Sequence, residues 1–262
     1  MSQERKKNIY RDDENIRSNI RLFVPDYLNE GSVIRLTQEQ SHYLINVMRV
    51  RPGNIIFLFN GKDGEWSAKL NCREKKQVIV KPISCQRKQF YEIELHLFFA
   101  PIKRTNIDFL VKKATELGVT ELTPVFTEHT QTKRVNVDRL YSNAIEAAEQ
   151  CRRLSVPVIN EPISLQELLS TWSGTNRLLV ADETGEGKYI VDVLELHQKT
   201  KKPPCSLLIG PEGGFAFHEL ENFKKYDFIH KVSLGPRIMR SETAAIAGLS
   251  VIQAFVGDWS VK

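Results

Sequence analysis

The chain has 262 residues, 41% of them hydrophobic, and a net charge of +5. This length leaves room for one large or two modest domains, and the composition is sufficient for a packed core. No apolar run approaches the roughly 20 residues of a membrane-spanning helix, and residues 1–19 lack the apolar centre of a signal peptide. We therefore expect a cytoplasmic protein with no membrane partner.

The beginning of the chain predicts a short extension followed by a small β-rich domain. Residues 1–19 contain few apolar side chains, so we expect a disordered extension that buries little surface. A helix is expected over 38–48, with a buried stripe made of His42, Leu44, Ile45 and Met48. Within residues 20–86, strands are predicted at 21–24, 55–59, 66–70 and 78–83. Several short strands in so short a segment favour a small β-barrel.

A polar run at residues 85–91 is the predicted boundary to a second domain, which spans 90–262. Beyond the boundary, apolar strands alternate with amphipathic helices. The strands are predicted at 95–100, 122–126, 178–181, 207–209 and 232–234, and the helices at 106–117, 138–154, 165–169, 190–197, 218–224 and 241–256. This alternation predicts an α/β domain in which helices cover both faces of a parallel sheet.

The basic side chains are concentrated in the first domain. Residues 20–89 carry twelve basic and six acidic side chains, whereas residues 90–262 have a net charge of −2. A basic surface suits a phosphate backbone, because binding releases the counterions of the nucleic acid. The same surplus is also compatible with solubility alone.

The four cysteines, at positions 72, 85, 151 and 205, are far apart in the sequence. They form no Cys-x-x-Cys pair, and no histidine stands at the spacing of a metal ligand. We therefore expect free thiols and no metal. Cys151 is expected to be a core residue of its helix rather than a nucleophile.

Two glycine-containing segments near the end of the chain are the strongest functional signal. They run over residues 207–214 and 234–245, and each joins an apolar strand to a helix. In open α/β sheets ligands bind at such junctions, and glycine lets a ligand approach the backbone closely. The segments contain neither Gly-x-Gly-x-x-Gly nor Gly-Lys-Ser/Thr, which disfavours a dinucleotide or phosphate loop. Taken alone, the first segment is equally compatible with a tight turn.

The second segment adds charged residues. Arg237 and Arg240 precede Ser241, which is a predicted N-cap. Glu242 follows in the first helical turn, where the helix dipole favours an anion. These residues favour a ligand loop over a simple turn.

The two segments contain the patterns Leu208-Ile209-Gly210-Pro211-Glu212-Gly213-Gly214 and Leu234-Gly235-x-Arg237-Ile238-x-Arg240-x-Glu242-Thr243-Ala244. These patterns resemble the two cofactor loops of the ribosomal RNA small-subunit methyltransferase E family, which is part of the SPOUT class. Further resemblance lies in Lys113-x-x-Glu116-Leu117-Gly118, Ala148-Glu149-Gln150-Cys151-x-Arg153 and His42-Tyr43-Leu44-x-x-Val47-Met48-Arg49. The resemblance covers about residues 20–259; Met239 replaces the usual leucine, and residues 1–19 have no recognisable counterpart.

The resemblance implies a PUA-like RNA-binding barrel followed by a SPOUT domain, whose chain is tied in a deep trefoil knot around S-adenosylmethionine. It also implies an activity, the methylation of N3 of one uridine in 16S ribosomal RNA within the small ribosomal subunit, performed by a homodimer. The last helix contains five small residues, which permit either close approach of a second copy or packing within the chain. They are Ala244, Ala245, Ala247, Gly248 and Ser250.

The chemistry of N3 methylation and the resemblance together predict the site residues. Arg240 is the leading catalytic candidate, because a fixed cation stabilises the negative charge that develops when N3 loses its proton. Glu242 is either the proton acceptor or a residue that holds the loop. The predicted cofactor residues are Leu208, Ile209, Gly210, Pro211, Glu212, Gly213, Gly214, Leu234, Gly235, Ile238, Met239, Arg240, Thr243 and Ala244. The predicted RNA-binding residues are Arg21, Arg49, Arg51, Arg104, Lys113, Arg152 and Arg153.

Two other functions are compatible with the sequence. One is a SPOUT enzyme with another RNA target, such as a transfer RNA or a ribose 2′-hydroxyl. The other is a noncatalytic RNA-binding assembly factor that keeps the fold. The product nucleoside distinguishes the first alternative, and cofactor binding distinguishes the second.

Overall fold

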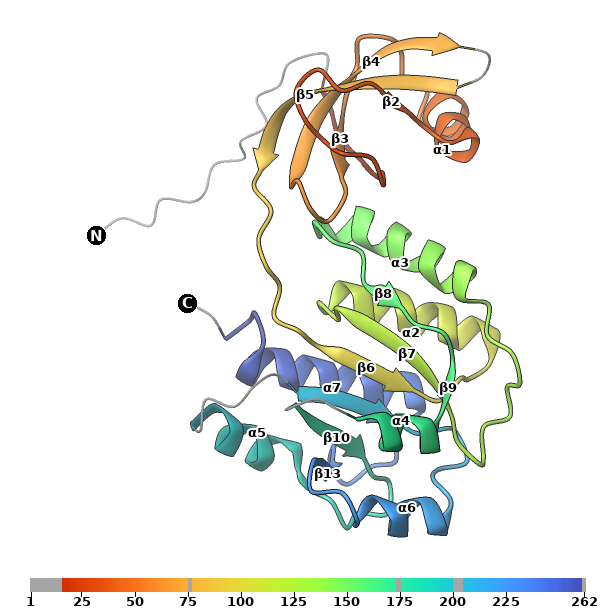
Figure 1. Cartoon of the computed structure of the whole chain (residues 1–262), viewed down its shortest axis with the longest axis vertical. Coiled ribbons are helices and arrows are strands. Elements are labelled where there is room, and N and C mark those ends of the chain that lie inside the picture. Colours follow the sequence, from red (N-terminus) through yellow and green to blue (C-terminus); the bar gives the residue numbers. More distant parts are fainter. Residues whose placement is uncertain (1–15, 75–76, 173–175, 200–204, 261–262) are drawn as a thin grey trace. The chain divides into compact units, whose positions relative to one another are not determined.

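The computed structural model describes residues 16–74, 77–172, 176–199 and 205–260. They form two compact units (Figure 1). The first comprises the chain up to Phe90 together with Arg152–Ser155, and the second comprises Tyr91–Cys151 and the chain from Val156 onward. The sequence pattern places Arg152–Ser155 in the second domain instead. No helix of the described chain has the length and apolar character needed to cross a membrane.

The first unit contains a five-stranded sheet in the order β1-β3-β4-β5-β2. Its strands are β1 (Ile16–Phe23), β2 (Ile34–Arg35), β3 (Ile55–Phe59), β4 (Glu65–Glu74) and β5 (Gln77–Arg87). Strand β1 is parallel to β3, and the other pairs are antiparallel. The apolar runs supply the core, in which Ile56, Leu58 and Val80 are fully buried. Because β1 begins at Ile16, residues 16–19 belong to the sheet and not to the predicted extension, whose residues 1–15 lie outside the described chain.

Helix α1 (Gln38–His42) and a π-helical turn η1 (Tyr43–Val47) follow β2. A capping box starts α1, in which Thr37 and Gln40 each bond the backbone of the other. The predicted buried stripe is wrong for His42, which is exposed. Ser41 takes the inward position instead, because its hydroxyl accepts a hydrogen bond from the Val78 amide.

The second unit is built on a parallel sheet in the order β11-β13-β10-β12-β6-β7-β8, with β9 paired to β7. The strands are β6 (His96–Phe99), β7 (Glu121–Phe126), β8 (Val158–Ile159), β9 (Ile163–Ser164), β10 (Arg177–Ala181), β11 (Lys188–Tyr189), β12 (Cys205–Ile209) and β13 (Ile229–Ser233). Leu97, Leu179 and Leu207 in the central strands are fully buried. Continuous apolar strands of this kind require cover on both faces of the sheet.

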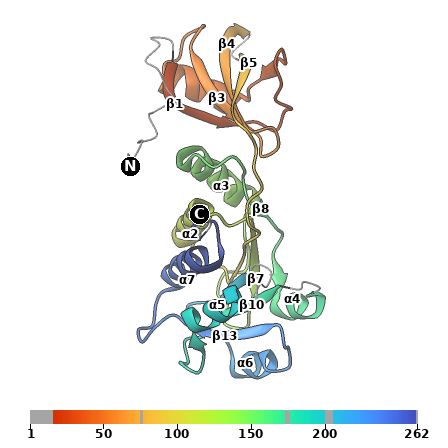
Figure 2. The ribbon, with the colours of Figure 1, turned by 90° about the vertical axis from the view of Figure 1, so that its left-hand side faces the viewer.

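Helices supply this cover; Figure 2 shows α2 and α7 on one side of the sheet and α4 on the other. One core joins the sheet to α2 (Arg104–Glu116), α3 (Val137–Cys151), α5 (Ile190–Lys199) and α7 (Ser241–Val256). A second core joins it to α4 (Leu165–Thr171) and α6 (Phe217–Phe223). The predicted α/β fold with a parallel sheet is confirmed. The trefoil knot stays a prediction.

The small residues of α7 serve packing within the chain at two positions. Ala245 is fully buried, and a Cβ on Gly248 would lie 2.9 Å from the Leu207 side chain. Glycine at position 248 therefore lets α7 approach strand β12 closely. The neighbouring strands β13, β10 and β12 are parallel, so their carboxyl ends meet at one edge of the sheet.

Candidate functional site

A cavity of about 740 Å³ lies at this edge of the sheet. It is lined by the loops that follow β10, β12 and β13, namely by residues 181–185, 187, 189, 209–212, 214, 233–241 and 244. The volume falls within the usual range for small-molecule sites, roughly 300–1,000 Å³. The two glycine-containing segments thus form one cavity together with a third loop.

The loop after β12 is a turn that depends on glycine. The Gly214 amide donates a hydrogen bond to the Pro211 carbonyl at 3.0 Å, and Gly214 has a φ of 69°. A Cβ on Gly210 would lie 2.8 Å from the Phe215 ring. Glycine at both positions lets the backbone itself line the cavity.

Ser241 joins the loop after β13 to this turn. Its buried hydroxyl donates a hydrogen bond to the Gly210 carbonyl at 3.0 Å. The predicted N-cap role of Ser241 is wrong, because α7 begins at Ser241 and Arg240 occupies the N-cap position without a side-chain capping bond. The serine instead holds the two glycine-containing loops together.

The third loop, residues 182–187, is missing from the sequence prediction. The carboxylate of Asp182 accepts hydrogen bonds from the Thr184 amide and hydroxyl at 3.0 and 2.8 Å. It also pairs with Lys231 on β13, at 2.8 Å. Burial raises the pKa of Asp182, but the bonds from Lys231 and Thr184 outweigh burial and leave the pKa below its usual value. A signal for this loop exists in the sequence, since a polar segment with Gly185 and Gly187 directly follows an apolar strand.

The loop after β7 contacts the glycine turn that follows β12. Nδ1 of His129 lies 3.1 Å from the carbonyl oxygens of both Gly213 and Gly214. Because carbonyl oxygens only accept hydrogen bonds, Nδ1 carries the proton. The buried Glu219 carboxylate accepts hydrogen bonds from the amides of Glu128 and Ala216, at 3.0 and 2.8 Å. The contacts of His129 and Glu128 span more than 80 residues of sequence, so no local pattern predicts them.

Most of the predicted cofactor residues line the cavity, namely Ile209, Gly210, Pro211, Glu212, Gly214, Leu234, Gly235, Ile238, Met239, Arg240 and Ala244. Three of them do not. Leu208 is buried in the core beneath α4 and α6, Gly213 contacts His129, and Thr243 is exposed.

Comparisons with known proteins place the chain in a family. A family model for an RNA methyltransferase domain matches residues 90–253, and one for an RNA methyltransferase PUA domain matches residues 36–83. The ribosomal RNA small subunit methyltransferase E of Rickettsia conorii is 33% identical, over 89% of this chain and 94% of its own length. The chain belongs to the ribosomal RNA small-subunit methyltransferase E family.

Solved structures agree with this membership of the methyltransferase E family. The ribosomal RNA small subunit methyltransferase E of Neisseria gonorrhoeae, bound to S-adenosylmethionine, gives a TM-score of 0.80 at 26% identity, over 92% of this chain and 99% of that one. A Legionella pneumophila protein with the bound cofactor gives a TM-score of 0.80 at 30% identity, over 90% and 97%. The predicted PUA-like first domain and methyltransferase second domain are confirmed as fold classes.

In this member of the methyltransferase E family, the two catalytic candidates have different surroundings. Arg240 is exposed and lines the cavity. Glu242 is not among the lining residues; its Oε1 accepts a hydrogen bond from Asn106 Nδ2 of α2 at 3.3 Å. The other oxygen, Oε2, is buried without a hydrogen-bond partner in the described chain. Glu242 thus connects the start of α7 to α2.

Arg49 and Arg51 are exposed after η1, and their contact with RNA stays a prediction. Arg49 has a φ of 52°, which is the left-handed conformation that usually favours glycine. The Val50 amide closes the turn on the Leu44 carbonyl at 2.9 Å. Arginine therefore occupies a backbone conformation in which glycine is favoured.

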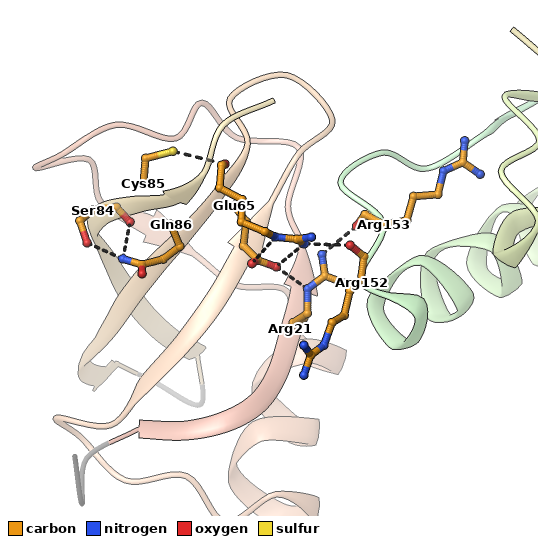
Figure 3. A network of polar contacts seen from close by, with 8 residues as sticks. Arg21, Glu65, Ser84, Cys85, Gln86, Arg152 and Arg153 are labelled. Carbon is orange, nitrogen blue, oxygen red and sulfur yellow. Dashed lines mark hydrogen bonds and ion pairs between the residues drawn. The ribbon is translucent and has the colours of Figure 1, made fainter. Parts of the chain in front are cut away.

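Arg21 and Arg153 are buried, and Figure 3 shows Arg21 directed at Glu65. Arg21 Nε lies 2.5 Å from Glu65 Oε1, and Arg21 Nη2 donates to the Arg153 carbonyl at 2.7 Å. Arg87 binds the same carboxylate. The Arg153 side chain donates to Ser155 Oγ at 3.0 Å. Because both side chains are buried and hydrogen-bonded within the first unit, we leave Arg21 and Arg153 out of the RNA surface.

The remaining basic candidates are less informative. Lys113 is paired with Glu116 at 2.8 Å. Arg152 is exposed, and its carbonyl accepts a hydrogen bond from Arg87. The side chain of Arg104 lies outside the described part of the chain. Cys151 is exposed at the end of α3 rather than a core residue, and it is a free thiol.

Proposed function

We propose that this chain transfers a methyl group from S-adenosylmethionine to N3 of one uridine in the 16S ribosomal RNA of the small ribosomal subunit. The observation that carries the proposal is the cavity formed where β10, β12 and β13 end, in a member of the methyltransferase E family. Two relatives that share the fold were solved with this cofactor.

The residues of the cavity fit S-adenosylmethionine. Backbone of Gly210 and Gly235 stands beside the apolar side chains of Ile209, Leu234 and Met239. Backbone amides and carbonyls suit the adenine and ribose, while the apolar side chains suit the rings and the methylene chain. The bound cofactor supplies an electrophilic methyl group. The loops hold it against the target base, and such alignment alone contributes several kcal/mol to catalysis.

Arg240 acts on the target base. When uridine N3 loses its proton, negative charge spreads onto O2 and O4, and a guanidinium beside the ring stabilises that charge. Arginine does not serve as the base, because it keeps its proton in proteins. Its place in the cavity wall, with an exposed side chain, supports this role.

Glu242 acts as a positioning residue. Its hydrogen bond from Asn106 links the first turn of α7 to α2, and Arg240 directly precedes that turn. A carboxylate also interacts favourably with the amino end of a helix. We therefore assign Glu242 to holding the Arg240 backbone and not to moving the N3 proton.

The first unit binds the RNA backbone through Arg49 and Arg51. Both side chains are exposed, and residues 20–89 carry the basic surplus of the chain. Phosphate contacts of this kind position an RNA without reading its sequence. The enzyme works in the cytoplasm, where its ribosomal substrate is located, and as a homodimer; the exposed parts of Ala244, Ala247 and Ser250 on α7 leave room for a second copy.

Transfer of labelled methyl groups tests the proposal. The chain is incubated with tritiated S-adenosylmethionine and, separately, with small ribosomal subunits, free 16S RNA and transfer RNA. We expect label in the small subunits. Label in transfer RNA alone supports another SPOUT target, and absence of both methylation and cofactor binding supports the noncatalytic assembly factor.

A further inference from the structure

Two carboxylates of the cavity, Glu183 and Glu212, form no ion pair within the described residues. The charged lining residues are Asp182, Glu183, Glu212, Arg237 and Arg240. The charge of Asp182 is compensated by Lys231. Glu183, the next residue, makes no hydrogen bond or ion pair with any residue of the described chain.

The Glu183 carboxylate lies against the glycine turn. A Cβ on Gly214 would collide with Glu183 Oε1 and would lie 3.0 Å from its Cδ. The side chain of Glu183 therefore reaches from the loop after β10 to the loop after β12, across the wall of the cavity. Glycine is favoured at position 214 by its φ of 69°, and the absence of a side chain there leaves the carboxylate next to the turn.

The backbone beside Glu183 is held in place on both sides. Asp182 is tied to Lys231, and Thr184 is tied to Asp182 by two hydrogen bonds. Glu186, the other carboxylate of the loop, pairs with Lys231 at 3.1 Å and does not line the cavity. The loop therefore directs one uncompensated negative charge, that of Glu183, into the cavity.

We propose that Glu183 determines specificity for the charged form of the cofactor, and this inference rests on the function proposed above. S-adenosylmethionine carries a positive sulfonium, whereas its demethylated product, S-adenosylhomocysteine, has a neutral thioether at the same place. A carboxylate directed at that charge favours the methyl donor over the product. Transfer of the methyl group removes the positive charge, so the attraction ends when the reaction does and the product leaves more easily.

Calorimetric titration of Glu183→Gln at pH 7.5 tests this role, with three ligands that share the adenosine and amino acid ends. S-adenosylmethionine and sinefungin carry a positive charge at the reacting position, and S-adenosylhomocysteine does not. We expect the affinity for both charged ligands to fall about fivefold, as for a partly exposed ion pair, and the affinity for S-adenosylhomocysteine to change less than about twofold.

Two results overturn the proposal. Equal losses for all three ligands show that Glu183 contacts a shared group, such as the ribose, or only shapes the loop. Unchanged affinity for all three shows that the carboxylate faces no ligand charge. Glu186→Gln is the matched control in the same loop, and we expect it to leave all three affinities unchanged. If Glu212→Gln lowers the affinity for the charged ligands and Glu183→Gln does not, Glu212 has the role proposed for Glu183.

A second variant tests separately whether the cavity is the cofactor site. Gly210 lines the cavity, and Gly210→Val places a side chain there, against the buried Phe215 ring. If this variant folds and binds S-adenosylmethionine as tightly as the wild type, the cavity is not the cofactor site. If it loses binding while Glu183→Gln retains the wild-type preference for the charged ligands, the site stands and the role of Glu183 is refuted.

Discussion

Arg21→Ala is expected to destabilise the first unit rather than to weaken RNA contacts. Glu65 is 1% exposed and accepts hydrogen bonds from Arg21 and Arg87. Loss of one partner leaves a buried carboxylate partly uncompensated, which costs about 3–5 kcal/mol in unfolding free energy. Because Arg87 stays bound through two N–H groups, we expect the lower end, about 3 kcal/mol.

Urea unfolding followed by circular dichroism measures this loss, and hydrogen exchange assigns it to β1, β3 and β4. Arg87→Ala is the matched comparison, since its side chain is 38% exposed and water can partly replace it, so we expect a smaller loss than for Arg21→Ala. Normal stability of Arg21→Ala together with weaker RNA binding would refute this reasoning and return Arg21 to the RNA surface.

The effect of Arg21→Ala depends on pH in a defined direction. Burial raises the pKa of Glu65, but hydrogen bonds from Arg87 and Arg21 outweigh burial and hold the pKa below its ordinary value of 4.5. A lowered folded-state pKa stabilises the fold above the unfolded-state value, and that contribution is lost as the pH falls through the folded-state value. The stability difference between wild type and variant is therefore complete at pH 7 and shrinks below about pH 4.

Three further predictions concern the site and the RNA surface. Arg240→Ala lowers kcat far more than it lowers cofactor affinity, because the arginine interacts with the base as it reacts. Single-turnover kinetics and calorimetry measure the two effects. Equal losses in both would make Arg240 a cofactor ligand instead. Glu242→Gln keeps the acceptor for Asn106 and retains at least about a tenth of kcat, whereas a proton acceptor at this position predicts a loss of about 100-fold or more. Arg49→Gly combined with Arg51→Gln lowers the slope of log affinity against log salt by about one to two, and an unchanged slope removes this loop from the RNA path. Glycine is the chosen replacement because Arg49 has a φ of 52°, so the charge is removed without adding strain.

The elements of the second unit follow largely from local patterns. The predicted bounds of the last helix, 241–256, coincide with α7, and the central apolar runs are all strands of the parallel sheet. Buried strands and long amphipathic helices encode their structure in a few neighbouring residues, so periodicity is enough to predict them. The position of the glycine segments follows from the same rule, because parallel strands present their carboxyl ends at one edge.

Contacts between distant segments limit the prediction. Arg153 has the charge of an RNA-binding residue, but its burial depends on the packing of Arg152–Ser155 with the first unit. Ser241 matches an N-cap pattern, but its hydroxyl donates a hydrogen bond to the distant Gly210 carbonyl instead. The loop at 182–187 lines the cavity only because β10 lies between β12 and β13 in the sheet. In each case a tertiary partner decides between two roles that the local sequence allows equally.

The identity of the methylated nucleoside tests the central claim most directly. Small ribosomal subunits that lack the modification are incubated with the chain and S-adenosylmethionine, then digested and analysed by mass spectrometry. We predict 3-methyluridine in the 16S RNA. A 2′-O-methylated nucleoside, or no methylated product although the cofactor binds, would contradict the proposed function.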